Sequence, residues 1–210
     1  MLLDIHTHHL PPQQEKAMIS VCMHNGLPIG TAYFSAGIHP WFLTEEDFPH
    51  QQKWLEKQLE DPRILALGEA GLDKRCNTPY HLQQEAFIYI GRMAEKHHLP
   101  LIIHAVKSYN DIMALKKEIK PSAAWIIHGF RGKKELAENL LKQGFYLSFG
   151  EKFQTEALQA VPNHRLLLET DESETPIEEI YQQAAALRNT DVNNLQESLH
   201  RTINNLFFNR

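Results

Sequence analysis

Residues 2–9 read LLDIHTHH, an apolar run that leads into three histidines within four positions. We predict a β-strand over Leu2–Ile5 that delivers His6 and His8 at its carboxyl end. Side chains two residues apart point to the same face of a strand, so these two imidazoles can reach one cation, while His9 turns the other way. His9 is therefore predicted to be dispensable for metal binding.

Similar short apolar runs recur to the end of the chain, separated mostly by longer amphipathic stretches. Their length is typical of buried parallel strands, and the intervening stretches have helical periodicity. The eight predicted strands are Leu2–Ile5, Ala17–Val21, Tyr33–Gly37, Ile64–Gly68, Leu101–Ile103, Ala123–Ile127, Phe145–Phe149 and Arg165–Leu168. The predicted helix starts are Thr44, Thr78 with Pro79, and the capping box Thr175-Pro176-Ile177-Glu178.

Eight strands alternating with helices predict an α/β fold, a TIM-like (β/α) barrel. Such barrels typically need about 250 residues, and this chain has 210. The missing length falls between His9 and Ala17 and between Cys22 and Tyr33, where there is too little sequence for a helix and its loops. The first two crossover helices are therefore predicted to be shortened or missing.

Composition indicates a globular protein, because 42% of residues are hydrophobic and 22% are charged. No linker or low-complexity segment interrupts residues 1–210, so a single domain is predicted.

A net charge of −5 argues against unspecific adhesion to nucleic acid. Neither a signal peptide nor a membrane span is expected, and the only cysteines are Cys22 and Cys76. We predict a cytoplasmic protein with no membrane association and no obligate protein partner.

Five predicted strands end in side chains that can bind a metal. In order along the chain, these are His6 with His8, Glu69, His104, His128 and Asp171. The carboxyl ends of barrel strands converge on one mouth, where active sites of this architecture lie. This mixture of imidazoles and carboxylates suits zinc, manganese, iron or a magnesium-like ion, and six ligands can hold one or two divalent cations.

Each signal taken alone has a simpler explanation. Two histidines at alternate positions are a weak metal signature, and a single histidine such as His104 or His128 is more often a hydrogen-bonded core residue. Five strand ends of the same polarity are hard to obtain by chance. Together they favour a metal site, although they do not identify the metal.

Seven motifs resemble, in the same order, those of the TatD family of metal-dependent hydrolases. They are DIHTHH at 4–9, GIHPW at 37–41, GEAGLD at 68–73, PLIIHA at 100–105, IIHGFRG at 126–132, LLLETD at 166–171 and TINNLFF at 202–208. The resemblance covers nearly the whole chain and fails only across residues 10–32. It implies a barrel related to the amidohydrolases that binds divalent metals and cleaves phosphodiesters, with deoxyribonuclease activity in several members.

The resemblance also implies roles for individual residues. His6 and His8 match the first-strand ligands, and Glu69 matches the carboxylate that touches or bridges the metals. The remaining implied ligands are His104, His128 and Asp171. We predict that Asp171 orients the attacking water and takes its proton, and that Glu69 is the second catalytic carboxylate.

Charge favours a phosphate substrate over a neutral amide. Two divalent cations facing only the two carboxylates of Glu69 and Asp171 leave a centre of about +2, which attracts an anion. Basic residues follow several of the predicted strands, although polar loops carry such residues in any case. The predicted substrate-binding residues are Lys74, Lys107, Arg131 and His39, and the predicted substrate is DNA or another phosphodiester.

Several alternatives stay open at this point. His39 could contact substrate or merely tie down its loop, and Trp41 with Phe42 could stack on a base or fill the gap left by the missing helices. The whole chain could instead be an amidohydrolase-type enzyme that cuts a C–N or ester bond. It could also be a non-catalytic metal-binding scaffold, although the complete ligand set argues against that.

Overall fold

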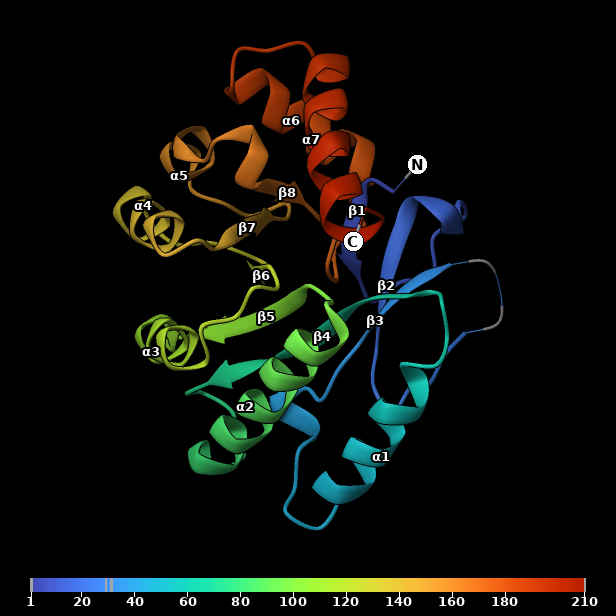
Figure 1. Cartoon of the computed structure of the whole chain (residues 1–210). Helices are drawn as coiled ribbons and strands as arrows, with labels where there is room; N and C mark the ends of the chain where they lie inside the picture. The colour runs from blue at the N-terminus through green and yellow to red at the C-terminus, as the bar shows by residue number, and fades with distance from the viewer. Residues whose placement is uncertain (1, 29, 31, 210) are drawn as a thin grey trace. The chain divides into compact units, whose positions relative to one another are not determined.

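The computed structural model describes residues 2–28, 30 and 32–209, and its strands are hydrogen-bonded in sequence order from β1 to β8 (Figure 1). The resolved pairings are parallel. The strands are β1 (Asp4–Thr7), β2 (Ala17–Val21), β3 (Tyr33–Ala36), β4 (Ile64–Asp73), β5 (Leu101–Val106), β6 (Trp125–Ile127), β7 (Tyr146–Phe149) and β8 (Leu166–Leu168). This order is the one predicted for a (β/α) barrel topology.

Helices follow every strand from β3 onward. They are the 3₁₀ helix η2 (Pro40–Phe42), α1 (Phe48–Gln58), α2 (Tyr80–His97), α3 (Tyr109–Ile119), α4 (Lys134–Lys142), α5 (Thr155–Ala160), the 3₁₀ helix η3 (Asn163–Arg165), α6 (Ile177–Leu187) and α7 (Val192–Phe207). Between β1 and β2 there is only the 3₁₀ helix η1 (Gln14–Lys16), and the described residues between β2 and β3 form no helix. The predicted loss of the first two crossover helices is confirmed.

Among the eight strands only β2 has the predicted bounds, and the largest differences are in β1, β4 and β5. β1 begins and ends later than expected, and β4 and β5 run on to Asp73 and Val106, so Glu69 and His104 lie within strands. Parallel pairing continues there because glycines let the backbones approach. A Cβ at Gly71 would collide with the carbonyl group of His104, and one at Gly37 would collide with the Gly68–Glu69 backbone.

None of the three predicted threonines caps its helix. Thr78 donates its hydroxyl to the Pro40 carbonyl (2.6 Å) and leaves the start of α2 without a side-chain cap, and α6 likewise begins after Pro176 without one. Thr44 accepts the Asp47 amide (3.1 Å), as a capping residue does, but this bond closes the turn before α1. Tertiary contacts compete for short hydroxyl side chains, so sequence alone places caps poorly.

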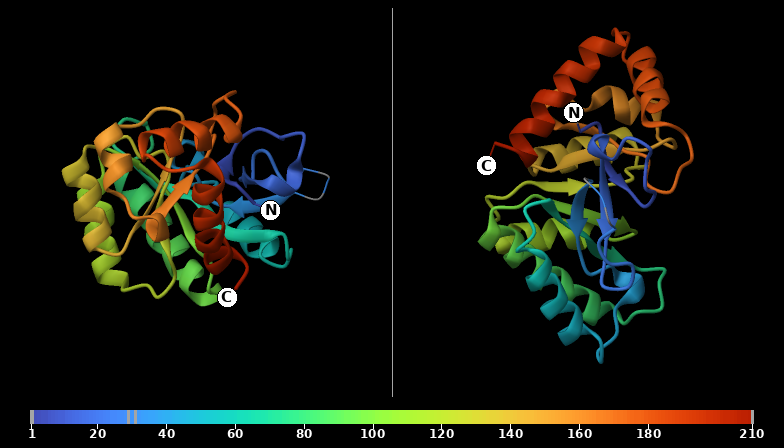
Figure 2. Two further views of the ribbon diagram at one scale, coloured as in Figure 1. Left: turned by 90° about the horizontal axis from the view of Figure 1, so that it is seen from above. Right: turned by 90° about the vertical axis from the view of Figure 1, so that its right-hand side faces the viewer.

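The chain forms two compact units, and the first comprises the residues up to Ile19 with those from Ile126 onward. In this unit α6 and α7 lie side by side (Figures 1 and 2). A bridge between Thr7 and Asp171 joins the end of β1 to the segment after β8. The buried Tyr181 hydroxyl donates to the Leu3 carbonyl (3.2 Å), which fixes α6 against the start of β1.

The second unit spans Ser20–Trp125. All ten residues of β4 are buried, as expected for a parallel strand covered on both faces, and α2 packs along it (Figure 1). The rings of Phe87 and Trp125 meet edge to face at 5.2 Å. The single-domain assignment stays a prediction. No helix in the described part of the chain has the length and apolar character needed to cross a membrane.

Candidate metal centre

The end of β1 and the segment after β8 bring His6, His8 and Asp171 together in the first unit. Main-chain bonds set this arrangement, because the Asp171 amide donates to the His6 carbonyl (2.9 Å) and the His8 amide donates to the Asp171 carbonyl (3.0 Å). Asp171 Oδ1 then lies 3.8 Å from His6 Nε2 and 3.6 Å from His8 Nε2. These three potential ligand atoms are close enough together to share one cation.

His128, directly after β6, belongs to a neighbouring donor group with Glu169 and Asp171. Its Nδ1 lies 3.2 Å from Glu169 Oε1, which also accepts the Gly129 amide at 2.6 Å. The His6 and His128 rings are 4.3 Å apart, so both donor groups of this unit adjoin. We call these five side chains, His6, His8, His128, Glu169 and Asp171, the β1/β8 group.

Glu169 provides a test of whether a metal fits these residues. Its side chain is fully buried, and its Oε2 has no hydrogen-bond partner in the part of the chain that the structure describes. Burial by itself raises the pKa of Glu169, but the nearby His128 and His6 imidazoles outweigh this and lower it. A buried carboxylate with an oxygen to spare, beside several imidazoles, is a donor set that suits a divalent cation.

The second unit holds a donor group around Glu69, made by β4, β5 and the segment between β3 and η2. Glu69 Oε1 lies 2.7 Å from His104 Nδ1 and 3.2 Å from His39 Nε2, and all three side chains are buried. Their ligand atoms are close enough together to hold one cation. We call Glu69, His39, His104 and the adjoining Asp73 the β4/β5 group.

Asp73, at the end of β4, anchors this group. Its Oδ2 accepts the Trp41 indole Nε1–H (2.7 Å) and lies 3.2 Å from His104 Nε2, while its Oδ1 accepts the Arg75 amide (2.7 Å). The Gln83 side chain accepts a hydrogen bond from the Asp73 amide and donates one to the Asp73 carbonyl. Burial alone raises the pKa of Asp73, but the hydrogen bonds from Trp41, the Arg75 amide and His104 bring it below its ordinary value.

The six predicted ligands divide between the two groups. His6, His8, His128 and Asp171 lie in the β1/β8 group, and Glu69 and His104 lie in the β4/β5 group. Their assignment as metal ligands stays a prediction. Sequence reasoning missed Glu169 and Asp73, although both stand within recognised motifs, ETD and GEAGLD, next to a strand end.

The predicted substrate-binding residues have different surroundings. Lys107 and Arg131 are exposed. Lys74 Nζ lies 2.6 Å from Asp111 Oδ2 and over the Tyr80 ring, so its charge is largely balanced within the protein. His39 is buried against Glu69. These contacts favour Lys107 and Arg131 over Lys74 for binding an anion.

His9 lies beyond the end of β1, in a bend, and its dispensability for metal binding stays a prediction. Its side chain is exposed, and its Nε2 lies 3.2 Å from the main-chain oxygen of Glu172. His9 belongs to none of the donor groups found among the described residues.

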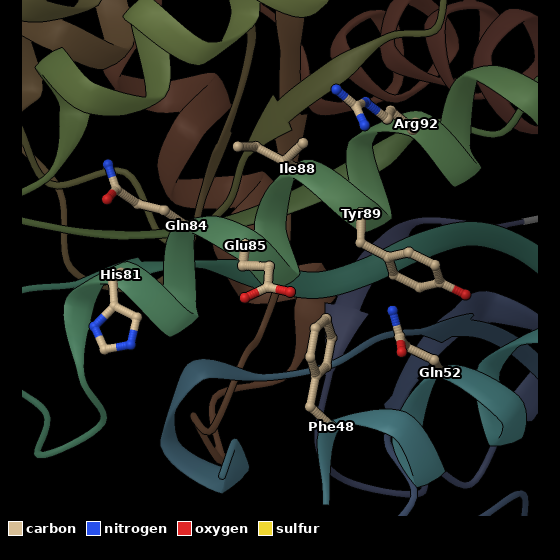
Figure 3. A pocket seen from close by; sticks show the side chains of 8 residues that line it. All are labelled: Phe48, Gln52, His81, Gln84, Glu85, Ile88, Tyr89 and Arg92. Atoms are coloured by element: carbon tan, nitrogen blue, oxygen red, sulfur yellow. The ribbon is translucent and has the colours of Figure 1, made fainter. Parts of the chain in front are cut away.

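A hollow between α1 and α2 in the second unit has a volume of about 480 Å³ (Figure 3). It is lined by Phe48, Gln52, His81, Gln84, Glu85, Ile88, Tyr89 and Arg92. Phe48 and Tyr89 meet edge to face at 6.1 Å across it. None of its lining residues belongs to a donor group found among the described residues.

Comparison with solved structures shows the fold. The TatD homologue YJJV from Escherichia coli matches with a TM-score of 0.79 at 19% identity, covering 98% of this chain and 97% of that one. A TatD family hydrolase from Entamoeba histolytica matches with a TM-score of 0.81 at 15% identity, covering 100% of this chain and 98% of that one. The predicted TIM-barrel type of α/β fold is thereby confirmed.

The comparison with curated protein sequences agrees with the comparison with solved structures. The chain is 34% identical over 151 residues to the metal-dependent hydrolase YabD of Bacillus subtilis, covering 66% of this chain and 58% of that protein. It is 31% identical over 147 residues to the human 3'-5' RNA nuclease TATDN2, covering 64% of this chain and 19% of that protein. The chain thus spans little more than half the length of its first curated relatives. Because the model of the TatD related DNase family matches residues 26–207, the chain belongs to that family.

Proposed function

We propose that this chain is a metal-dependent hydrolase that cleaves phosphodiester bonds, with DNA as its main substrate. The observation that carries the proposal is the presence of imidazole and carboxylate donor groups at the strand ends, where the family motifs lie. Family membership supports hydrolysis, and the relatives' names include both metal-dependent hydrolases and an RNA nuclease. RNA is therefore the first competing substrate to test.

One or two divalent cations are proposed to bind the family ligands. These are His6, His8, His128 and Asp171 in the first unit and Glu69 and His104 in the second. When bound, such a cation lowers the pKa of a water molecule and polarises a phosphoryl oxygen. Buried Glu169 holds His128 in place through Oε1, and Asp73 does the same for His104.

Asp171 is the proposed general base. Its side chain is 25% exposed, so it reaches both solvent and the imidazoles of His6 and His8. It can therefore orient a water molecule and accept its proton as the oxygen attacks phosphorus. The exposed cations Lys107 and Arg131 are proposed to bind phosphates that flank the scissile one.

The test measures bound metal in the purified protein and then its turnover. End-labelled single-stranded DNA, the matching RNA, methyl p-nitrophenyl phosphate and a cyclic amide are each incubated with magnesium, manganese or zinc. We expect cleavage of DNA and of the small phosphodiester and none of the amide. Cleavage of the amide alone would transfer the assignment to the amidohydrolase alternative, and a metal-loaded protein inert on every substrate would favour the scaffold.

Asp171→Asn is the decisive variant, and His9→Ala is its matched control. Asp171→Asn is expected to fold and to lose about 10²–10⁴-fold in kcat, the usual contribution of general base catalysis. His9→Ala, changed one position from His8 but in an exposed side chain, is expected to keep wild-type turnover. A wild-type rate in Asp171→Asn would remove Asp171 from the chemistry.

A further inference from the structure

Two neighbouring aromatic side chains are left open to solvent beside the β4/β5 group. Trp41 is 55% exposed and Phe42 is 46% exposed, and both belong to the 3₁₀ helix η2. Their rings lie 5.0 Å and 5.6 Å from the ring of His39, and Trp41 also lies 5.7 Å from the ring of His104. Apolar surface this large is normally buried, so its exposure next to donor residues needs a reason.

Filling the space of the missing crossover helices explains this surface only in part. The Phe42 ring lies 5.4 Å from the ring of His24, in the segment between β2 and β3. A side chain that only fills a gap is buried in it, whereas about half of the surface of each of these two residues, Trp41 and Phe42, is exposed. Buried packing in this segment comes from Leu43 and Ile38 instead. The exposed faces of Trp41 and Phe42 are therefore available to a ligand.

Trp41 is held in one orientation although it is exposed. Its indole Nε1–H donates to Asp73 Oδ2 (2.7 Å), its main-chain amide donates to His39 Nδ1 (3.1 Å), and its ring stands edge to face against His39. The Phe42 segment is also fixed, because Gln51 donates to the Phe42 carbonyl (2.7 Å). A fixed aromatic ring loses little conformational freedom when it binds, which favours stacking.

We propose that Trp41 and Phe42 form a stacking surface for the bases of a single-stranded nucleic acid. This proposal rests on the proposed phosphodiesterase function and adds how the substrate is held. A flat, fixed, exposed indole beside a donor group suits a planar base whose own phosphate lies close by, and stacking of this kind tolerates every base. Paired bases are stacked within their duplex, so the surface selects unpaired strands.

Asp73 links this surface to the predicted metal ligands. One oxygen, Asp73 Oδ2, receives the Trp41 indole and lies within hydrogen-bond distance of His104 Nε2. The stacking ring and the imidazole therefore share one anchor. Binding of a base against Trp41 is expected to place the adjoining phosphate in register with the ligands of the β4/β5 group.

The test compares two fluorescein-labelled single strands with phosphorothioate backbones, one carrying bases and one abasic. Both have the same length and charge, so they separate base stacking from phosphate binding. Binding to the protein as purified, with its metal, is followed by fluorescence anisotropy. We expect wild-type protein to prefer the strand with bases by about tenfold, as one stacked base provides.

Three variants locate the effect. Trp41→Ala is expected to lose most of the preference by weakening only the strand with bases, and Trp41→Phe is expected to keep most of it because a ring remains. Trp54→Phe, in α1, is the control for removing a tryptophan and is expected to match wild type. Melting temperatures verify that each variant is folded.

Two results would overturn the proposal: equal affinity of the wild-type protein for both strands, or an unchanged preference in Trp41→Ala. Turnover of methyl p-nitrophenyl phosphate distinguishes this failure from failure of the proposed function. Turnover of the small phosphodiester without a preference for the strand with bases would refute only the stacking proposal. Base preference without turnover of any phosphodiester removes the hydrolase assignment and leaves a single-strand binding site.

Discussion

The two donor groups are built from the same residue types but are held by different forces. In the β4/β5 group, side chains hold one another, since Glu69 bonds to two imidazoles and Asp73 to His104 and Trp41. In the β1/β8 group, the Glu169 side chain holds His128, but main-chain bonds set the geometry of His6, His8 and Asp171. The Asp171 carboxylate stays 3.6–3.8 Å from the imidazoles of His6 and His8.

This difference predicts how each donor group responds to a side-chain substitution. A network of side chains fails when one member is removed, because the others are left buried without partners. A group positioned by its backbone tolerates the loss of one side chain but depends on the bonds that fix its strand. The predictions below test this contrast, beginning with the largest expected effect.

Glu69→Ala is expected to disrupt the β4/β5 group most severely. It removes the carboxylate that both His39 and His104 contact, and it removes a predicted metal ligand. Loss of a ligand's hydrogen-bond partner alone costs about 10–100-fold in metal affinity, so loss of the ligand itself should exceed about 100-fold. Metal titration by calorimetry measures this. Wild-type affinity would exclude Glu69 as a ligand, and Glu60→Gln, in an exposed carboxylate, is the control.

Asp73→Asn is expected to weaken metal binding by about 10–100-fold while the fold is kept. The neutral amide no longer stabilises the His104 imidazole or accepts the Trp41 indole as strongly. The measurement is metal content after dialysis against a weak chelator, together with the Trp41 base preference. If metal retention is unchanged, Asp73 does not position His104.

Asp4→Ala tests the main-chain support of the β1/β8 group. Buried Asp4 accepts the Thr170 hydroxyl (2.6 Å), the Thr170 amide (3.1 Å) and the His6 amide (3.2 Å), which fixes the segment between β8 and Asp171. Leaving these donors without an acceptor should lower the free energy of unfolding by about 1–3 kcal/mol. Urea denaturation measures this, and Asp4→Asn, which keeps an acceptor, should lose less. Equal stability of wild type and Asp4→Ala would contradict this account.

His9→Ala marks the smallest effect. His9 is exposed and contacts only the Glu172 main chain through its ring, so metal content, turnover and stability should all stay close to wild type. Loss of metal from this variant would show that strand alternation misassigned the three histidines of DIHTHH.

The sequence predicted much of this protein because its signals are local. Short apolar runs and intervening helical periodicity predict the strand order, and the chain length between Cys22 and Tyr33 predicts a crossover without a helix. Alternation within DIHTHH predicts that His9 differs from His6 and His8, although β1 already ends at Thr7. Each of these depends on spacing along one segment, which a sequence shows directly.

Tertiary structure alone decided what depends on distant segments meeting. β4 extends to Asp73 because Gly71 lets the strand approach the His104 backbone. Thr78 donates its hydroxyl to the Pro40 carbonyl and therefore does not cap its helix. The tertiary structure also revealed Glu169 and Asp73 as the carboxylates that hold predicted ligands. A carboxylate's role depends on burial and partners, which arise only when strands far apart in the sequence pack together.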